Sequence, residues 1–243
     1  VDVSEHNGNI DWTKVKASGI VGAILRCGYG QDQTGQDDKK WLRNVSECER
    51  LGIPYGVYLY SYAKTTGTVQ GEINHALRLL KGHSPAWPVY FDSEQPGTQG
   101  VAKANAKAFC DAMVAHGYKA GIYASTSWYK NYIGQTWGYS LWIASYGSKS
   151  AGVNGIDMWQ YTSKGSIPGI PGNVDVNYVY KDFGGTVTPV QKPTVAPAPK
   201  PVDESWKGDK RYYLNNSRVG AWQKAMNICL LYTSDAADDL TRV

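Results

Sequence analysis

The chain has 243 residues, of which 25 are lysine or arginine and 21 are aspartate or glutamate, so its formal net charge at pH 7 is +4. Because this charge is small and no basic run alternates with aromatic residues, we expect no nucleic-acid partner. The chain contains no stretch of about 18 apolar residues, so we expect no membrane-spanning helix and no membrane partner.

The first 185 residues or so contain eight short runs of β-branched and aromatic residues, a pattern typical of strands. The runs are residues 1–4, 21–26, 55–60, 89–92, 120–124, 140–144, 158–162 and 174–178. Apolar residues at helical spacing lie between several of them and predict three clear helices and two weaker ones. The clear helices follow Asp38, Thr68 and Val101 and end at Gly52, Gly82 and Gly117, and the weaker ones follow Trp12 and Ser125.

Strands that alternate with helices favour a parallel sheet with right-handed crossovers. Eight strands and about five helices predict an α/β fold, an irregular TIM-like barrel. Its last part is expected to be the irregular one, because the strands beyond residue 135 leave little room for crossover helices. An open, doubly wound sheet is the alternative. In either fold, ligands bind at the C-terminal ends of the strands.

Acidic residues lie at the strand positions where such a fold carries its chemistry. Asp92 and Glu94 end the fourth predicted strand, and alternation puts them on one face, about 6.6 Å apart. Asp2 lies in the first strand and Asp175 in the last, which become neighbours if the sheet closes. Each acid alone could serve a turn or a salt bridge, but four in one barrel mouth are costly unless a function requires them.

Tyrosine and tryptophan, at 18 and 9 residues, far outnumber the 3 phenylalanines. Both combine an apolar ring with a polar group, which suits sugar binding, although a core rich in tyrosine would give the same numbers. Several rings fall near predicted strand ends, where we expect them to contact sugars together with Gln160, with a place in the core as the alternative for some of them, such as Trp159 and Tyr123. These rings are Tyr29, Tyr60, Tyr62, Tyr123, Trp142, Tyr146 and Trp159. We also expect Arg26 to pair with one of the acids.

A proline-rich run at residues 189–201, with five prolines in thirteen positions, ends this domain and is typical of a semi-rigid spacer. The predicted domains are therefore a barrel at 1–187, a linker at 188–203 and a further piece at 204–228. Residues 188–228 carry seven basic and three acidic residues, which suits either an anionic polymer or an ordinary solvated surface.

Residues 229–243, CLLYTSDAADDLTRV, resemble the conceptual translation of a sequencing-library adapter. We expect this segment to be an artefact, with a genuine helical tail as the alternative. Three cysteines then remain, Cys27, Cys48 and Cys110. Because their number is odd and no CxxC spacing occurs, we expect buried free thiols rather than disulfides or zinc. The four histidines show no metal spacing either, so we expect no metal and no cofactor.

Eight short motifs, in order along the chain, resemble those of glycoside hydrolase family 25 lysozymes. They are DVSEHNGNIDW (2–12), RCGYG (26–30), GVYLYS (56–61), YFDSE (90–94), GIY (121–123), LWIASY (141–146), MWQYTS (158–163) and VDVN (174–177). The resemblance implies an irregular eight-stranded barrel and N-acetylmuramidase activity. The substrate would be the β-1,4 bond between N-acetylmuramic acid and N-acetylglucosamine in bacterial peptidoglycan.

The resemblance also implies roles for the four acids. Glu94 matches the general acid, which then activates water as a base. Asp92 matches the partner that assists the 2-acetamido group of the substrate through an oxazolinium intermediate. Asp2 and Asp175 match the other two acids of the cleft, which tune pKa values. The spacing of Asp92 and Glu94 alone leaves direct displacement by water open.

Residues 215–227 faintly resemble the start of a small helical peptidoglycan-binding repeat, so residues 204–228 are interpreted as a truncated wall-binding module. The whole layout resembles phage endolysins and secreted autolysins. It implies a monomer that acts at the bacterial cell wall, either outside the cell or after release from the host cytoplasm at phage lysis. A catalytically silent glycan-binding protein is the alternative. Chitinase-like activity is a less favoured hypothesis, because the longer acidic strand motif of chitinases is missing.

Overall fold

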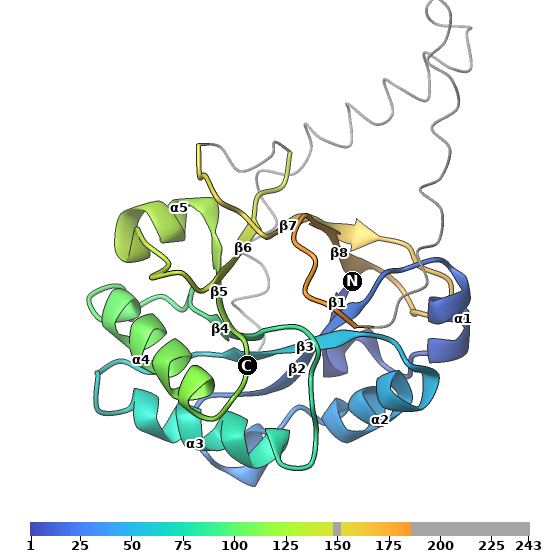
Figure 1. The fold of residues 1–243 in the computed structure, drawn as a ribbon, viewed down its shortest axis with the longest axis horizontal. Helices are drawn as coiled ribbons and strands as arrows, with labels where there is room; N and C mark the ends of the chain where they lie inside the picture. Colours follow the sequence, from blue (N-terminus) through green and yellow to red (C-terminus); the bar gives the residue numbers. More distant parts are fainter. Residues whose placement is uncertain (148–151, 186–243) are drawn as a thin grey trace, which may run out of the picture. The chain divides into compact units, whose positions relative to one another are not determined.

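Eight strands close into a barrel in the computed structural model, which describes residues 1–147 and 152–185 (Figure 1). The strands are β1 (Asp2–Val3), β2 (Ala23–Tyr29), β3 (Tyr55–Tyr60), β4 (Val89–Asp92), β5 (Ala120–Ser125), β6 (Ser140–Ala144), β7 (Met158–Gly165) and β8 (Val174–Val179). Their order around the barrel is their order in the sequence. The predicted α/β barrel is thus confirmed, and the open sheet is excluded.

Five α-helices lie among the described residues, and α1 to α4 follow one another around the outside of the barrel (Figure 1). They are α1 (Trp12–Ala17), α2 (Trp41–Leu51), α3 (Val69–Leu80), α4 (Ala102–Ala115) and α5 (Thr126–Trp128), with short helical turns at η1 (Glu5–Asn7), η2 (Thr34–Gln36) and η3 (Tyr129–Ile133). Local sequence sets their ends. Asp11 caps α1 by accepting from the Lys14 backbone N–H, and Gly52 ends α2 with a φ of 64°, as a left-handed helix end requires.

The strands are not all parallel, which corrects the prediction from the alternating elements. Neighbouring strands from β1 to β7 run parallel, whereas β8 is antiparallel to both β7 and β1. The connection from Gly165 to Val174 is too short for a crossover helix, so it forms a hairpin instead. Closure through β8 pairs Asp175 with Asp2 of β1.

Strand alternation produces two separate apolar clusters. Outward residues such as Phe91 pack on the helices, with the Phe91 ring 4.9 Å from that of Phe109 in α4. Inward residues, including Ile24, Tyr90 and Trp142, form the second cluster inside the barrel. The Tyr90 and Trp142 ring centroids lie 5.2 Å apart, and both side chains are almost fully buried. Part of the tyrosine and tryptophan excess is therefore core.

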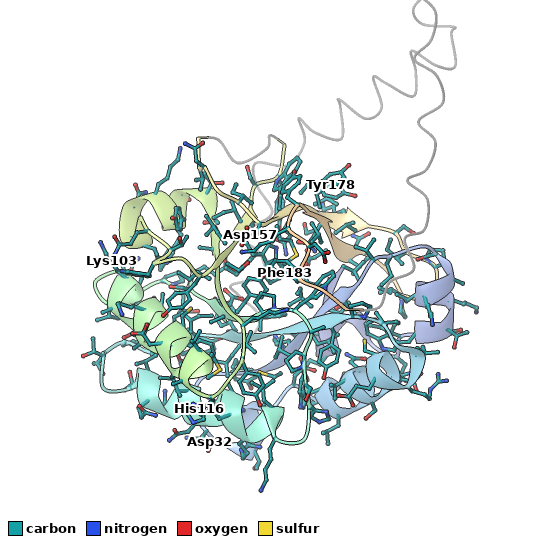
Figure 2. All side chains as sticks on the ribbon, viewed as in Figure 1. Asp32, Lys103, His116, Asp157, Tyr178 and Phe183 are labelled. Atoms are coloured by element: carbon teal, nitrogen blue, oxygen red, sulfur yellow. The ribbon has the colours of Figure 1, made fainter. Side chains whose placement is uncertain are left out.

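The outer face of the β7–β8 hairpin carries a cluster of aromatic rings. Trp159 lies 5.6 Å from Tyr178 and 5.8 Å from Tyr161. Figure 2 shows the side chain of Tyr178 at the edge of the molecule, and it is 52% exposed. Trp159 precedes the inward-facing Gln160, so alternation turns its ring away from the barrel interior. Trp159 thus lies on the outer face of the hairpin, and its contact with a sugar stays a prediction.

The structure bears on only part of the remaining sequence predictions. The predicted linker (188–203), the module fragment (204–228) and the segment 229–243 lie outside the described residues. Cys27, Cys48 and Cys110 are free and buried, which confirms that prediction. Within the described part of the chain, no helix combines the length and apolarity that a bilayer crossing needs.

Candidate active site

The C-terminal end of β4 carries two carboxylates. Asp92 is 4% exposed at the last position of the strand, and Glu94 follows it, half-buried. Backbone hydrogen bonds continue the sheet past this point, because Ser61 N donates to Asp92 O at 3.0 Å and Ser93 N donates to Tyr123 O at 3.0 Å. The chain that carries both acids is therefore held on two sides by the ends of β3 and β5.

Asp2 is bound inside the barrel by two amide side chains. Asn177 Nδ2 of β8 donates to Asp2 Oδ2 at 2.7 Å, and Gln160 Nε2 of β7 lies 3.1 Å from both carboxylate oxygens. Asp175 also makes a side-chain hydrogen bond with Asp2. Strand pairing thus brings the first and the last strand together at one carboxyl group, as expected for a closed sheet.

Gln160 connects this carboxyl group to two tyrosines. Its Oε1 accepts from Tyr123 OH at 3.0 Å and from Tyr146 OH at 2.8 Å, while its Nε2 faces Asp2. The side chain is 3% exposed. Gln160 therefore fixes the orientation of both phenols relative to the acids.

The four acids lie close enough to affect one another and the surrounding phenols. Burial, and then the charges of Glu94 and Asp2, raise the pKa of Asp92 well above its usual range, and the Arg26 cation opposes this only in part. Burial raises the pKa of Asp2, while the hydrogen bonds from Asn177 and Gln160 act in the opposite direction. In addition, Asp92 Oδ1 is buried with no hydrogen-bond partner in the described structure. Asp92 is therefore a carboxyl group with a free acceptor atom.

A second group of predicted site residues forms an aromatic cluster of Tyr29, Tyr60 and Tyr62. The Tyr62 ring lies 5.1 Å from Tyr60 and 5.9 Å from Tyr29, in tilted and edge-on contacts. Tyr60 OH donates to Gln95 Oε1 at 3.0 Å, in the residue after Glu94. Tyr62 is 42% exposed. These rings lie at the ends of β2 and β3, beside the segment that carries the two carboxylates of β4.

Trp142 lies deeper than the other predicted binding residues. It is 1% exposed, its ring centroid is 4.3 Å from that of Tyr123, and its Nε1 donates to Asn177 Oδ1 at 2.8 Å. The structure thus shows Trp142 supporting Tyr123 and Asn177 from below. Its direct contact with a sugar stays a prediction.

Arg26 pairs with acids other than the four predicted. Its guanidinium contacts Glu5 Oε1 at 2.8 Å and Asp38 Oδ2 at 2.7 Å, and its charge reaches Asp92 only as a weaker influence. Asn177 was not among the predicted site residues, although it is two positions after Asp175. The alternation of β8 was the signal for it, because residues two apart on a strand share a face.

Metal binding is not suggested by the described residues, among which no group of three or more histidine, cysteine, aspartate or glutamate side chains has the geometry to hold an ion. The side chains that the strands bring together here are carboxylates, amides and phenols. A half-exposed carboxyl group beside a buried, partly uncompensated one is an arrangement typical of acid–base catalysis.

Comparison with known proteins assigns the fold to a family. The family model for glycosyl hydrolases family 25 matches residues 1–170. The chain belongs to this family. The match to family 25 includes Asp2, Asp92 and Glu94 and ends before β8, so it does not reach Asp175 or Asn177.

Individual family 25 relatives have low sequence identity to this chain, between 25% and 30% in the three examples that follow. The autolytic lysozyme of Clostridium acetobutylicum is 25% identical over 193 residues, which cover 77% of this chain and 58% of that protein. The CTP1L endolysin superposes with a TM-score of 0.67 at 29% identity, over 75% of this chain and 66% of that one. The modular autolysin LytC of Streptococcus pneumoniae, solved with a synthetic peptidoglycan ligand, gives a TM-score of 0.63 at 30% identity. This match covers 73% of this chain and 45% of that one. The chain spans less than two thirds of the length of each.

Proposed function

We propose that this protein is a lysozyme of the N-acetylmuramidase type, which hydrolyses the β-1,4 bond between N-acetylmuramic acid and N-acetylglucosamine in bacterial peptidoglycan. The observation that carries the proposal is the pair at the end of β4, where the half-buried Glu94 follows the buried Asp92, whose pKa is raised. Family membership supports the reaction class, and relatives that are named lysozyme, endolysin and autolysin support the substrate.

Glu94 would act first as the acid. It donates its proton to the glycosidic oxygen while the bond between that oxygen and the anomeric carbon breaks. The oxygen of the substrate's own acetamido group bonds to the anomeric carbon and forms an oxazolinium ion. The oxygen of a water molecule then bonds to that carbon while the bond between the carbon and the acetamido oxygen breaks, and Glu94 accepts a proton from the water, so that the enzyme ends in its starting state.

Asp92 would assist the acetamido group. Its buried Oδ1 has no partner among the described residues, and an acetamido N–H would supply the missing donor. As positive charge develops on the oxazolinium ring, a carboxylate at this position becomes more favourable than a neutral acid. The charge of Asp2 would help to keep the pKa of Asp92 high, and Asp175 would hold Asp2 in place through their hydrogen bond.

The acetamido route and direct displacement by water make different products. The acetamido route retains the anomeric configuration, because two displacements occur, whereas direct attack by water inverts it. Proton NMR of the first product formed from a soluble peptidoglycan oligosaccharide distinguishes them. We expect the β-anomer; initial formation of the α-anomer would exclude participation of the acetamido group.

The central experiment is the clearing of a suspension of purified bacterial cell walls by the full chain. We expect clearing by the wild type and a loss of about 100-fold or more in rate for both Glu94→Gln and Asp92→Asn, as for removal of a general acid or base. Lys103→Gln, at an exposed position of α4, is the matched surface control and should clear at the wild-type rate. New reducing ends should accompany the clearing.

Two results would overturn parts of this proposal. Wild-type protein that binds walls without clearing them would support the alternative, a catalytically silent glycan-binding protein. Unchanged clearing by Glu94→Gln would leave a hydrolase but remove Glu94 as its acid. We also propose that the protein works as a monomer at the bacterial wall, reached from outside or at phage lysis, which size-exclusion chromatography and lysis of intact cells would test.

A further inference from the structure

Glu72 of α3 is a buried acid outside the four-carboxylate cluster. Its side chain is 0% exposed, and it binds the segment that follows β3. Ser61 Oγ donates to Glu72 Oε2 at 2.7 Å, and the backbone N–H of Tyr62 donates to Glu72 Oε1 at 2.7 Å. The backbone N–H of Ala63 makes a third hydrogen bond to the carboxyl group. Three consecutive residues are thus bound by one side chain.

The segment that Glu72 binds is part of the candidate active site. Ser61 N donates to the backbone oxygen of Asp92, so one end of the segment is attached to the strand of the two carboxylates. The next residue, Tyr62, has its ring against Tyr29 and Tyr60. A displacement of residues 61–63 would therefore move the exposed Tyr62 ring relative to Asp92.

Burial of the Glu72 carboxyl group is energetically unfavourable, and an apolar side chain could fill the same space. An apolar side chain in its place would avoid the cost of removing a carboxyl group from water. Within the described structure, Glu72 makes no ion pair with a lysine, an arginine or a histidine. Burial accordingly raises its pKa to about 7, although the hydrogen bonds from Ser61, Tyr62 and Ala63 oppose the shift. What the carboxyl group provides is the attachment of the segment.

We propose that Glu72 is a positioning residue that fixes residues 61–63 and thereby holds the Tyr62 ring where a sugar of the glycan strand stacks. This inference rests on the proposed function, because it assumes that the cleft binds a glycan. Glu72 itself contacts neither substrate nor reacting atoms in this proposal. It acts through Tyr62, so its removal should weaken substrate binding more than it slows the chemical step.

Two substitutions of Glu72 distinguish the effect of its hydrogen bonds from the effect of its charge. In Glu72→Gln, the amide oxygen still accepts from Tyr62 N, and the amide nitrogen donates to Ser61 Oγ, so the segment stays attached without a charge. Glu72→Leu has a similar size but no polar atom, so all its hydrogen bonds to residues 61–63 are lost. Leu79→Ala on the same helix is the matched control, because Leu79 is buried seven positions after Glu72 and has no polar side-chain atom.

The test measures KM and kcat on a soluble peptidoglycan hexasaccharide with the full chain. We expect Glu72→Leu to raise KM about tenfold and to change kcat by less than about twofold, and Glu72→Gln to stay within about twofold of the wild type in both. Tyr62→Ala should raise KM by a similar factor. The double variant Glu72→Leu with Tyr62→Ala should raise KM no further than Tyr62→Ala alone, because both changes remove one contact.

Independent, multiplicative effects of the two substitutions on KM would overturn the proposal, and so would an equal loss in Leu79→Ala. If Glu72→Leu does not fold, Ser61→Ala removes a single attachment and should raise KM about twofold to threefold. An unchanged KM in Ser61→Ala would then count against the proposal. Failure here is distinct from failure of the proposed function, because in that case the wild type itself would not cleave the hexasaccharide.

Discussion

Asn177 joins the acidic cluster to the barrel core through a single amide group. Its nitrogen donates to Asp2 Oδ2, and its oxygen accepts from Trp142 Nε1. Because each end of the amide has a fixed partner, the side chain has one orientation. The Trp142 indole in the barrel interior and the Asp2 carboxyl group are thus held by the same residue.

Replacement of Asn177 by leucine should lower the free energy of unfolding by about 2 kcal/mol, because it leaves a buried indole N–H and a buried carboxylate each without one partner. Urea unfolding followed by tryptophan fluorescence measures this loss. The neighbouring residue provides the control: Tyr178→Phe, on the outer face, should change stability by less than about 0.5 kcal/mol. Equal effects of the two substitutions would contradict a special role for the amide.

Sequence alone predicted most of the residues that the structure brings together at the candidate site, but not the buried acid Glu72 that binds the segment beside it. The four acids were predictable because strand alternation and strand ends are local properties. Glu72 also falls on the buried face of its predicted helix, but its partners lie on the segment after β3. Hydrogen bonds between distant segments leave no periodic signal, so the function of a buried polar residue was not predictable.

At the scale of single elements, strand positions were predicted to within a few residues where the strand interior is apolar. β2 runs on to Tyr29, beyond the predicted end at Arg26, through a register shift at Gly28. A Cβ atom at Gly28 would lie 2.7 Å from Gln36 O, so this glycine permits the close approach of the following loop. β7 extends to Gly165 because β8 pairs with it as a hairpin, a tertiary contact that the local sequence does not encode.

The glycine that ends α2 allows a test of how local sequence sets the end of a helix. Gly52 has a φ of 64°, and its N–H bonds to the carbonyl oxygens of Cys48 and Glu49. Gly52→Ala should lower the free energy of unfolding by about 1 kcal/mol, because a Cβ atom is unfavourable in the left-handed region. Thermal unfolding measures the change. Gly35→Ala is the control, since no atom lies within 4 Å of a Cβ there and its φ is not in this region; an equal loss would refute the conformational explanation.

For the whole molecule, buried carboxyl groups make stability depend on pH. The pKa of Glu72 rises from 4.5 to about 7 on folding. A raised pKa means that the folded state holds the proton more tightly, so this stabilisation is complete below pH 4.5 and is lost as the pH rises through about 7. Burial raises the pKa values of Asp2 and Asp92 in the same direction.

Glu72→Gln should remove this part of the pH dependence. Between pH 4 and pH 8 the free energy of unfolding of the wild type should fall by up to about 3 kcal/mol relative to the variant, because 2.5 pKa units separate the two states. Urea unfolding at four pH values measures the difference. The other acids are common to both proteins, so their contributions to the pH dependence cancel in the difference. If the free energies of unfolding of the two proteins changed equally with pH, Glu72 would not titrate between pH 4 and pH 8.

The proposed artefact at the end of the sequence gives a further test on the complete protein. Deletion of residues 229–243 should leave both the wall-clearing rate and Tm unaltered, because we attribute no function to this segment. Clearing assays and calorimetry on the two chains provide the comparison. A large loss of either property would identify the segment as a genuine part of the protein.

Closure of the barrel through β1 and β8 also has a consequence for the order of folding. The hydrogen bond between Asp2 and Asn177 joins residues 175 positions apart, and such long-range contacts form late. During synthesis the chain leaves the ribosome from its N-terminus, so β1 has no strand partner on one side until β8 has been made. We therefore expect the acidic cluster to be completed late in folding, and a nascent chain interrupted before β8 to lack Asp175 and Asn177.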